Sequence, residues 1–252
     1  MAKTVANTIN LRLNTHPVRA TSMAKKTYFV TGTNTDVGKT VVTAALLEAA
    51  KLAGKRTLAM KPVASGCVQT PDGLRNSDAL ILQNAMTEQL PYDVVNPVAL
   101  EPAIAPHVAA SQAGRNLSAD RLAGFCRGIQ LRPADLLLIE GAGGWRVPLN
   151  DRETYSALAQ LLNIPVILVV SLELGCINHA LLSAEAIRRD GLVLAGWVAN
   201  RPREAVMSCE TDTLAYLQQH LGCPCLGVMP WLSEPRPQAL AKFLNVTPLI
   251  EN

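Results

Sequence analysis

From residue 27 onward the chain alternates short apolar runs with amphipathic segments of helical length. Runs that are apolar on both faces are typical of strands in a parallel sheet that helices cover on both sides. We expect such strands at residues 28–31, 57–61, 136–139, 166–170, 193–199 and 225–229. We expect helices at residues 39–53, 77–86, 118–129, 155–162, 177–189 and 204–220. The alternation predicts an α/β fold, with a mostly parallel twisted sheet of about seven strands flanked by helices.

One segment departs from this alternation. Residues 90–114 contain four prolines and show no clean period, so we expect an ordered loop region with one short helix there. No internal repeat and no linker divides the rest of the chain. We therefore expect a single domain over residues 23–252.

The first 22 residues differ in composition from the rest. They hold Lys3, Arg12 and Arg19 and no acidic residue, so they carry the whole formal excess of +3. The remainder has 20 basic against 20 acidic residues, which is not the positive excess expected of a nucleic-acid-binding protein. We expect residues 1–22 to be a disordered extension or a start-site artefact, with a mitochondrial transit peptide as the alternative.

Cysteine usage and hydropathy limit the setting in which the chain works. Six cysteines are scattered along it, with no Cys/His pairs at the spacing of a zinc site, which favours a reducing, cytoplasmic compartment. No apolar run approaches the roughly 20 residues that are needed to cross a bilayer. We therefore expect neither a membrane nor a nucleic acid as a partner.

Residues 32–40, with the sequence GTNTDVGKT, form the strongest local motif. They follow an expected strand and open an expected helix, which is the setting of a phosphate-binding P-loop. Backbone N–H groups of the turn and the positive helix end can surround a polyphosphate, Lys39 can reach its terminal phosphates, and Thr40 can ligate Mg²⁺. Five residues separate the two glycines where the common pattern has four, so a coincidental glycine-rich turn is the alternative.

A Mg²⁺ ion beside Thr40 requires further oxygen ligands, and two carboxylates are candidates. Glu140 ends an apolar run, which places it at the carboxyl edge of a buried strand, where α/β sheets bind ligands. Asp78 lies just after a turn, and a helix cap near Ser77 would explain its position equally well. The spacing leaves both interpretations of Asp78 open.

Two further loops follow expected strands at the same sheet edge. Lys61 and Ser65 present an ammonium and a hydroxyl there, and a lysine beside a P-loop can stabilise an anion, although a solvated charge is the common alternative. The small residues 141–144 follow Glu140 and allow a second backbone segment to approach a bound phosphate or substrate. A tight strand-to-loop turn is the alternative for them.

Seven motifs occur in order along the chain. They are GTNTDVGKT at 32–40, KPVASG at 61–66, GLRNSDAL at 73–80, EGAGGW at 140–145, GCINHALL at 175–182, GWVANR at 196–201 and PWL at 230–232. Together they closely resemble the dethiobiotin synthetase family of biotin biosynthesis. The resemblance runs from about residue 26 to about residue 235, and it is far more specific than any single motif.

The resemblance implies a P-loop enzyme that is an ATP- and Mg²⁺-dependent cyclo-ligase. In that family, 7,8-diaminopelargonate takes up CO₂ on one amine as a carbamate, and a carbamate oxygen attacks the γ-phosphate of ATP. The second amine then closes on the carbamic-phosphoric anhydride, which gives the cyclic urea, ADP and phosphate. No general base is needed for the phosphoryl transfer, because the nucleophile is already an anion.

The resemblance also implies roles for individual residues. Catalytic roles fall on Lys61 and Lys39, and metal ligation falls on Thr40, Asp78 and Glu140. ATP-binding positions are Asp36, Val37, Gly38, Lys39, Thr40, Val41, Asp78, Glu140, Gly141, Ala142, Gly143, Asn200, Arg201, Pro230, Trp231 and Leu232. Substrate-binding positions are Ser65, Gly175, Cys176, Ile177 and Asn178. The last four open a helix that meets the substrate carboxylate from a neighbouring subunit in this family, which implies a homodimer.

Two alternatives remain beside this assignment. Arg201 departs from the family's Asn-Asp pattern at the adenine site, and Arg146 follows the glycine-rich loop, so a paralogue acting on another diamine is one alternative. The second is a nucleotide switch of the partitioning or septum-site class. Those proteins usually carry an additional lysine early in the P-loop, where this chain has Thr33, Asn34 and Thr35.

Overall fold

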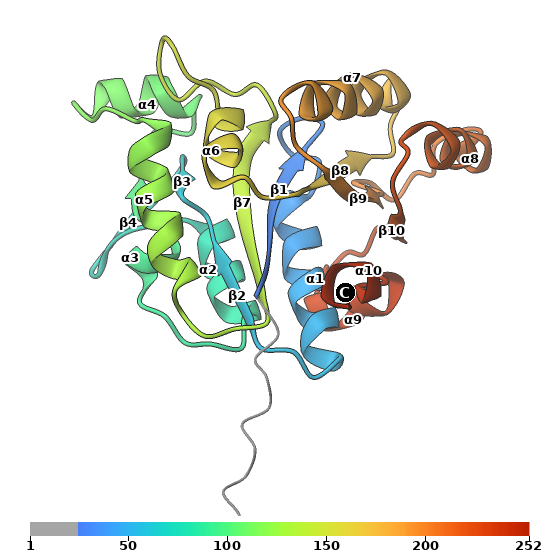
Figure 1. Cartoon of the computed structure of the whole chain (residues 1–252), viewed down its shortest axis with the longest axis horizontal. Helices are drawn as coiled ribbons and strands as arrows, with labels where there is room; N and C mark the ends of the chain where they lie inside the picture. Colours follow the sequence, from blue (N-terminus) through green and yellow to red (C-terminus); the bar gives the residue numbers. More distant parts are fainter. Residues whose placement is uncertain (1–24, 252) are drawn as a thin grey trace, which may run out of the picture.

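The computed structural model describes residues 25–251 and has a central sheet of parallel strands (Figure 1). These strands are β1 (Lys26–Gly32), β2 (Thr57–Met60), β7 (Leu136–Gly144), β8 (Val166–Ser171), β9 (Leu194–Asn200) and β10 (Cys225–Met229). Their spatial order is β10-β9-β8-β1-β7-β2. The expected α/β fold is confirmed, but this sheet has six strands where about seven were expected. The predicted extension, residues 1–22, lies outside the described residues.

The central strands bury side chains on both of their faces. In β1, Phe29 belongs to one apolar core, whereas Tyr28 and Val30 belong to the other. Alternate side chains of a strand point to opposite faces, so one short run supplies both cores. Every residue of β8 is buried, as are residues 136–141 of β7. A strand of this kind needs helices on both sides, which explains why the apolar runs predicted it.

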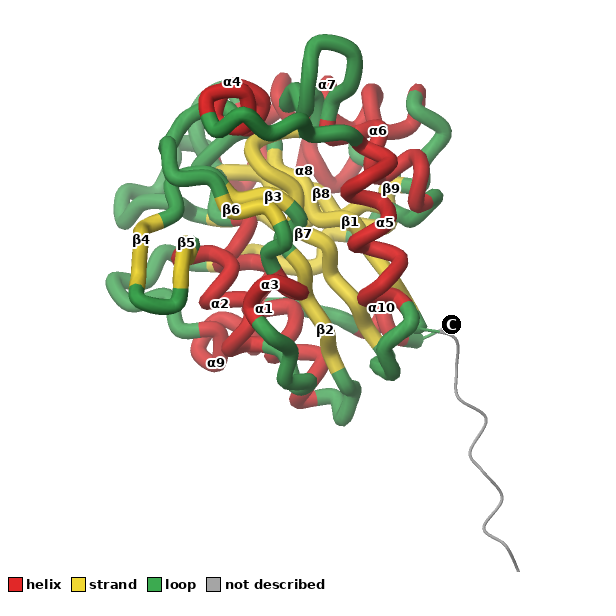
Figure 2. Tube along the Cα trace, turned by 90° about the vertical axis from the view of Figure 1, so that its left-hand side faces the viewer, coloured by secondary structure: helices red, strands yellow, loops and turns green. Residues whose placement is uncertain are grey.

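Helices cover both faces of the sheet (Figure 2). The core that contains Val30 is closed by α1 (Lys39–Leu52), α2 (Ser77–Ala85), α9 (Pro237–Leu240), a 3₁₀ turn (Ala241–Phe243) and α10 (Thr247–Ile250). The core that contains Phe29 is closed by α5 (Ala119–Gln130), α6 (Tyr155–Leu162), α7 (Cys176–Arg189) and α8 (Glu210–His220). Among residues 25–251, no helix combines the length and the apolar character that a membrane span requires.

The proline-rich segment contains more regular structure than we expected. It forms two short helices, α3 (Tyr92–Val95) and α4 (Pro106–Gln112), and the short strand β6 (Val98–Ala99). Pro106 is the first residue of α4, where its missing N–H removes no helix bond. The strand β6 pairs with β3 (Val63–Ala64), and β4 (Val68–Thr70) pairs with β5 (Gly73–Arg75). Both pairs stand apart from the central sheet, which is why the central sheet stops at six strands.

The helix α8 begins at Glu210, although the sequence pattern placed its start at residue 204. Cys209, directly before it, has a φ of 55°. That left-handed backbone cannot continue a right-handed helix, so α8 cannot extend back through this residue.

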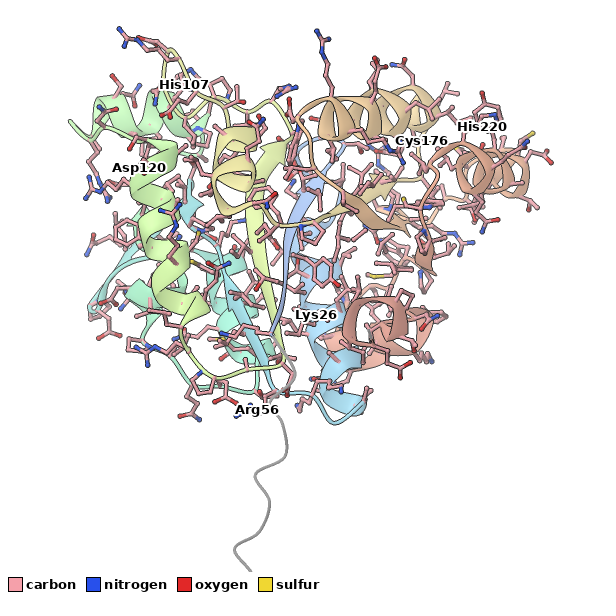
Figure 3. All side chains as sticks on the ribbon, in the orientation of Figure 1. Lys26, Arg56, His107, Asp120, Cys176 and His220 are labelled. Carbon is pink, nitrogen blue, oxygen red and sulfur yellow. The ribbon has the colours of Figure 1, made fainter. Side chains whose placement is uncertain are left out.

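The parallel arrangement brings all carboxyl ends of the central strands to one edge of the sheet. Lys26, which begins β1, and Arg56, which precedes β2, lie in the lower half of Figure 3. Cys176, at the start of α7, lies in the upper half. The segments that follow the strand ends therefore gather at the sheet edge in the upper half. They include the P-loop after β1, Lys61 after β2 and the end of β7 that carries Glu140.

Candidate functional site

The P-loop connects β1 to α1 at the carboxyl edge. Gly38 precedes the first residue of α1 and has a φ of 89°, a backbone conformation that favours glycine. Lys39 is buried, with 7% of its surface exposed, and its Nζ donates a hydrogen bond to the carbonyl of Asn34 at 2.9 Å. The lysine therefore folds back over its own loop, where it faces the space that a phosphate group would take.

Burial changes the protonation of this lysine. Desolvation lowers the pKa of Lys39 from 10.5 to about 8. The negative charge of Glu140 opposes that decrease, while the positive charge of Lys61 adds to it. A bound polyphosphate would supply the counter-charge that Lys39 lacks in the ligand-free protein.

Two side chains contact the carboxylate of Glu140, and a third joins them through Lys61. Its Oε1 accepts a hydrogen bond from the hydroxyl of Thr40 at 2.8 Å and one from Nζ of Lys61 at 2.6 Å. Nζ of Lys61 also lies 3.0 Å from Oδ2 of Asp78. The candidates that the sequence placed on four separate segments thus form one cluster.

Strand register explains this cluster. Val30 of β1 pairs with Glu140 of β7, and Met60 of β2 pairs with Ile139. Lys61 therefore leaves β2 beside Glu140, which is why residues 79 positions apart come into contact. The backbone of Lys61 is held in place as well, since Nδ2 of the buried Asn96 donates to its carbonyl at 2.7 Å.

The cluster is buried and charged. Glu140 is fully buried and Lys61 is 5% exposed, while the side chain of Asp78 retains 42% exposure. Desolvation alone would lower the pKa of Lys61, but attraction and hydrogen bonds from Glu140 and Asp78 outweigh it and raise the pKa above its ordinary value. Lys61 is therefore an ammonium at neutral pH.

The structure also distinguishes the two interpretations of Asp78. The cap of α2 is Asn76, whose Oδ1 accepts a hydrogen bond from the N–H of Ala79 at 3.2 Å. Asp78 is thus not the cap, and its carboxylate points to Lys61 instead. Nδ2 of Asn76 donates to the carbonyl of Ser65 at 3.1 Å, so this cap also holds the loop that follows Lys61.

Sequence reasoning missed the supporting roles of Asn76 and Asn96. The only local signal was an asparagine directly before a helix, which is a common cap, and nothing local pointed to Asn96. Between them they fix both ends of the segment from Lys61 to Ser65. The hydroxyl of Ser65 is buried and has no hydrogen-bond partner among the described residues.

The glycine-rich end of β7 lies against the P-loop. Gly144 pairs with Gly32, and a Cβ atom at Gly144 would lie 3.5 Å from the carbonyl oxygen of Gly32. Gly143 has a φ of 61°, and a Cβ atom there would lie 2.6 Å from Cγ2 of Val147. A side chain at Gly143 would collide with Val147, and the predicted approach of residues 141–144 to a bound phosphate or substrate stays a prediction.

A second group joins the end of β9 to the P-loop. Asn200 is 6% exposed, and its Nδ2 donates a hydrogen bond to the carbonyl of Val37 at 2.9 Å. Arg201, the next residue, binds both carboxylate oxygens of Glu210, with Nε 2.9 Å from Oε2 and Nη2 2.5 Å from Oε1. The guanidinium of Arg201 is therefore held in an ion pair by Glu210, the first residue of α8.

The remaining predicted positions belong to two other segments at the same edge. Residues 230–232 follow β10, the neighbour of β9, and are partly exposed. Gly175 precedes α7 with a φ of 95°, Cys176 is buried and Asn178 is exposed. Leu174, directly before this turn, is 98% exposed. Gly175 and Asn178 are therefore accessible to solvent, whereas Cys176 is not.

Comparisons with known proteins relate this site to other sequences and folds. A family model described as an AAA domain matches residues 26–239. An ATP-dependent dethiobiotin synthetase BioD of Marinobacter nauticus is 72% identical over 234 residues, covering 91% of this chain and 100% of the relative. Proteins of the same name from Cellvibrio japonicus and, as BioD 1, from Escherichia coli O157:H7 are 59% and 47% identical, covering 91% and 88% of this chain and 100% and 98% of theirs.

Solved structures with much lower identity share the fold. A ParA family ATPase from Chlorobium tepidum TLS superposes with a TM-score of 0.52 at 15% identity, covering 91% of this chain and 99% of that one. The septum site-determining protein MinD from Pyrococcus horikoshii OT3, complexed with Mg-ADP, gives 0.50 at 19% identity, with 90% of each chain covered. At these identities the likeness supports the fold alone.

Proposed function

Since the chain belongs to the family of ATP-dependent dethiobiotin synthetases, we propose that its carboxyl-edge cluster closes the ureido ring of 7,8-diaminopelargonate in biotin synthesis. The observation that carries this proposal is the contact of the Lys61 ammonium with Glu140, directly beside Thr40 of the P-loop. It brings a cation for an anionic substrate next to the loop that binds the phosphates of ATP. The enzyme is a ligase that forms carbon–nitrogen bonds.

The donors in the cluster suit Mg²⁺. The hydroxyl of Thr40 and the carboxylates of Asp78 and Glu140 are all oxygen donors, which hard divalent cations prefer. Oε2 of Glu140 is buried without a partner among the described residues, so this carboxylate keeps a free acceptor. Thr40, Asp78 and Glu140 would hold the ion, and bound Mg²⁺ would neutralise charge on the β- and γ-phosphates.

The reaction requires one nucleophile to be generated before phosphoryl transfer. One amine of the substrate adds to CO₂, which forms a carbamate and releases a proton. A carbamate oxygen then attacks the γ-phosphorus of ATP, and ADP leaves. The second amine attacks the carbonyl carbon of the resulting anhydride, phosphate leaves, and the loss of a proton gives the cyclic urea.

The residues of this chain supply position and charge for these steps. Lys39 neutralises the terminal phosphates, and Lys61 holds the carbamate beside them. A lysine that remains an ammonium at neutral pH suits this role, because its charge attracts both the carbamate and the phosphoryl group in transfer. The hydroxyl of Ser65, buried without a partner, is available to a polar atom of the substrate.

We assign recognition of the adenine base to Asn200, with Pro230, Trp231 and Leu232. An asparagine amide offers two N–H donors and an acceptor oxygen, which can match the edge of adenine. Its Nδ2 already binds the P-loop carbonyl of Val37, and its Oδ1 remains for the exocyclic amine. Arg201 is placed to orient this segment through Glu210 rather than to contact the base itself.

The first turn of α7 supports a homodimer with shared sites. Residues 175–178 present the N–H groups of a helix start, which favour an anion such as the substrate carboxylate. Leu174 beside them is almost fully exposed, so a second subunit could reach this turn. We propose that each subunit offers this turn to the site of its neighbour.

A product assay tests the function directly. Purified protein mixed with 7,8-diaminopelargonate, bicarbonate, Mg²⁺ and ATP should form dethiobiotin, ADP and phosphate. The variant Lys61→Ala should abolish product formation while ATP still binds, because Lys39 remains in place. Lys242→Ala removes an exposed lysine as the matched control and should leave turnover unchanged. Folded protein that forms no dethiobiotin would contradict the proposal, and competing diamines in the same assay decide between the proposed substrate and that of a paralogue.

A further inference from the structure

The loop after β7 is fastened from outside the site by a single carboxylate. Oδ2 of Asp190 accepts hydrogen bonds from Nε1 of Trp145 at 2.8 Å and from Nη1 of Arg146 at 2.7 Å. Its Oδ1 accepts a third, from Nη2 of Arg146, at 2.8 Å. The Arg146 pair is thus bidentate, which fixes orientation as well as distance.

This carboxylate is well enclosed by its partners. The side chain of Asp190 is 12% exposed, and Trp145 is 4% exposed. Nη1 of Arg146 also donates to the hydroxyl of Ser156, which is 2% exposed, at 2.9 Å. The side chain of Arg146 is itself 50% exposed, so it is the buried partners Trp145 and Ser156 that distinguish this contact from a solvated surface ion pair.

Asp190 is not placed to stabilise its own helix. It is the residue that caps the C-terminus of α7, where the helix dipole is negative and an acidic side chain is unfavourable. Arg188 and Arg189 supply the basic charge that suits this end. The position of Asp190 is explained by the residues it holds, which lie 45 and 44 positions earlier in the chain.

The carboxylate of Asp190, bound to Trp145 and Arg146, is called the anchor below. Two contacts connect this anchor to the P-loop. The indole of Trp145 meets the ring of Phe29 edge-on, with centroids 6.0 Å apart, and Phe29 lies in β1 three residues before Gly32. Gly144, directly before Trp145, pairs with Gly32 itself. A shift of Trp145 would therefore move the backbone that borders the phosphate site.

We propose that Asp190 is a positioning residue for the nucleotide site, which holds residues 141–144 against the P-loop through Trp145 and Arg146. The inference deepens the proposed function and rests on it, since it assumes that this loop borders bound ATP. Asp190 touches no reacting atom, so its effect reaches ATP only through the position of the loop.

The first test measures ATP kinetics and binding. In the dethiobiotin assay, Asp190→Ala should raise the KM for ATP about fivefold, within the range expected for residues that act through their neighbours, while kcat changes by less than about twofold. The Kd of a non-hydrolysable ATP analogue should rise by the same factor. Glu185→Ala removes an exposed acid from the same helix and should leave both constants unchanged. A Kd and KM that match those of Glu185→Ala overturn the proposal.

The second test follows Trp145 itself. The chain has three tryptophans, so the emission of Asp190→Ala is compared with that of the same substitution in a Trp145→Phe background. A red shift that disappears in that background shows that the anchor holds Trp145. A raised Kd without the shift, or the shift without a raised Kd, overturns the route through this residue.

Two further measures keep the outcomes distinct. Asp190→Asn retains an oxygen that can accept from Trp145 but loses the charge facing Arg146, and it replaces Asp190→Ala should that variant fail to fold. Its Kd should lie between those of the wild type and Asp190→Ala. If the wild-type protein forms no dethiobiotin, the proposed function fails, while analogue binding and emission still decide the role of Asp190.

Discussion

Nζ of Lys61 lies 2.6 Å from Oε1 of Glu140, at the point where the neighbouring strands β2 and β7 approach their carboxyl ends. The same oxygen accepts a hydrogen bond from the hydroxyl of Thr40. Lys61 and Thr40 therefore share one oxygen of this carboxylate, whereas its Oε2 has no partner among the described residues. A divalent cation held through Oε2 would leave the ammonium of Lys61 in place on Oε1, beside the P-loop.

Glu140→Gln should raise the Mg²⁺ requirement. The substitution keeps the shape of the side chain but removes the charge that a divalent cation and Lys61 both use. We expect the Mg²⁺ concentration at half-maximal activity to rise by at least about tenfold, and stability to fall by about 1–3 kcal/mol because the buried ammonium loses its closest counter-charge. A Mg²⁺ titration and urea unfolding measure the two effects. Asp78→Asn, at a half-exposed carboxylate, should cost less stability, and an unchanged Mg²⁺ requirement in Glu140→Gln would argue against ligation there.

Gly38→Ala should nearly abolish ATP binding. A Cβ atom at this position would lie 2.2 Å from Nδ2 of Asn200, and the φ of 89° adds backbone strain. Gly54→Ala is the matched control, because Gly54 also has a positive φ, of 74°, but has open space around it. The control should lose about 1–2 kcal/mol of stability and bind ATP normally. For Gly38→Ala, near-abolition means a loss of ATP affinity well beyond tenfold, where each tenfold step corresponds to about 1.4 kcal/mol of binding energy. Equal ATP affinity in the two variants would contradict the collision with Asn200.

ATP affinity should fall as the pH rises through about 8. The pKa of Lys39 is lowered to about 8, chiefly by burial, so the ligand-free enzyme loses this positive charge as the pH increases past that value. Since the charged form attracts phosphates, the Kd for ATP should rise between about pH 7 and pH 9. Lys39→Arg keeps its charge throughout this range and should flatten the profile. A profile that stays steep in Lys39→Arg would assign the titration to another group.

Asn200→Ala should weaken binding of the phosphates as well as of the base. The truncation leaves the carbonyl of Val37 without the hydrogen bond that it accepts at 2.9 Å, inside the P-loop. Inorganic tripolyphosphate separates the two effects, because it has no base. We expect its Kd to rise at least about threefold, a modest share of the 1–3 kcal/mol associated with an unsatisfied buried group. Calorimetry that finds a loss for ATP but none for tripolyphosphate would restrict Asn200 to base recognition.

Particular residues show how far the sequence determined the fold and the site. The central strands were predictable because runs such as residues 166–170 are apolar on both faces, and only a covered sheet accommodates them. The P-loop was predictable because its two glycines, Lys39 and Thr40 all lie within residues 32–40, between an apolar run and a helical pattern. The contacts between distant segments were not predictable from the sequence. Lys61 contacts Glu140 because β2 lies beside β7, and the order of strands is a property of the whole sheet.

Other features lay beyond any local pattern. The start of α8 depends on the left-handed backbone of Cys209, and a cysteine does not predict that backbone conformation. In the sequence, Asp190 is an ordinary acidic residue at the end of a predicted helix. Its contacts with Trp145 and Arg146 arise only in the folded protein. Asp78 was ambiguous in sequence because a cap and an ion pair favour the same residue type, and the structure shows that Asn76, two residues earlier, is the cap.

The direction of β1 also decides how this enzyme can be attached to a solid support. Its seven residues run from Lys26 at one edge of the sheet to Gly32 at the other, a distance of about 20 Å. A tether bound on the Lys26 side would leave the P-loop facing the solution. A tether near residue 251 would be attached next to the core. Leu249 and Ile250 are buried there, and the carbonyl of Leu249 accepts a hydrogen bond from Tyr28. Attachment there would pull on the core that supports α1.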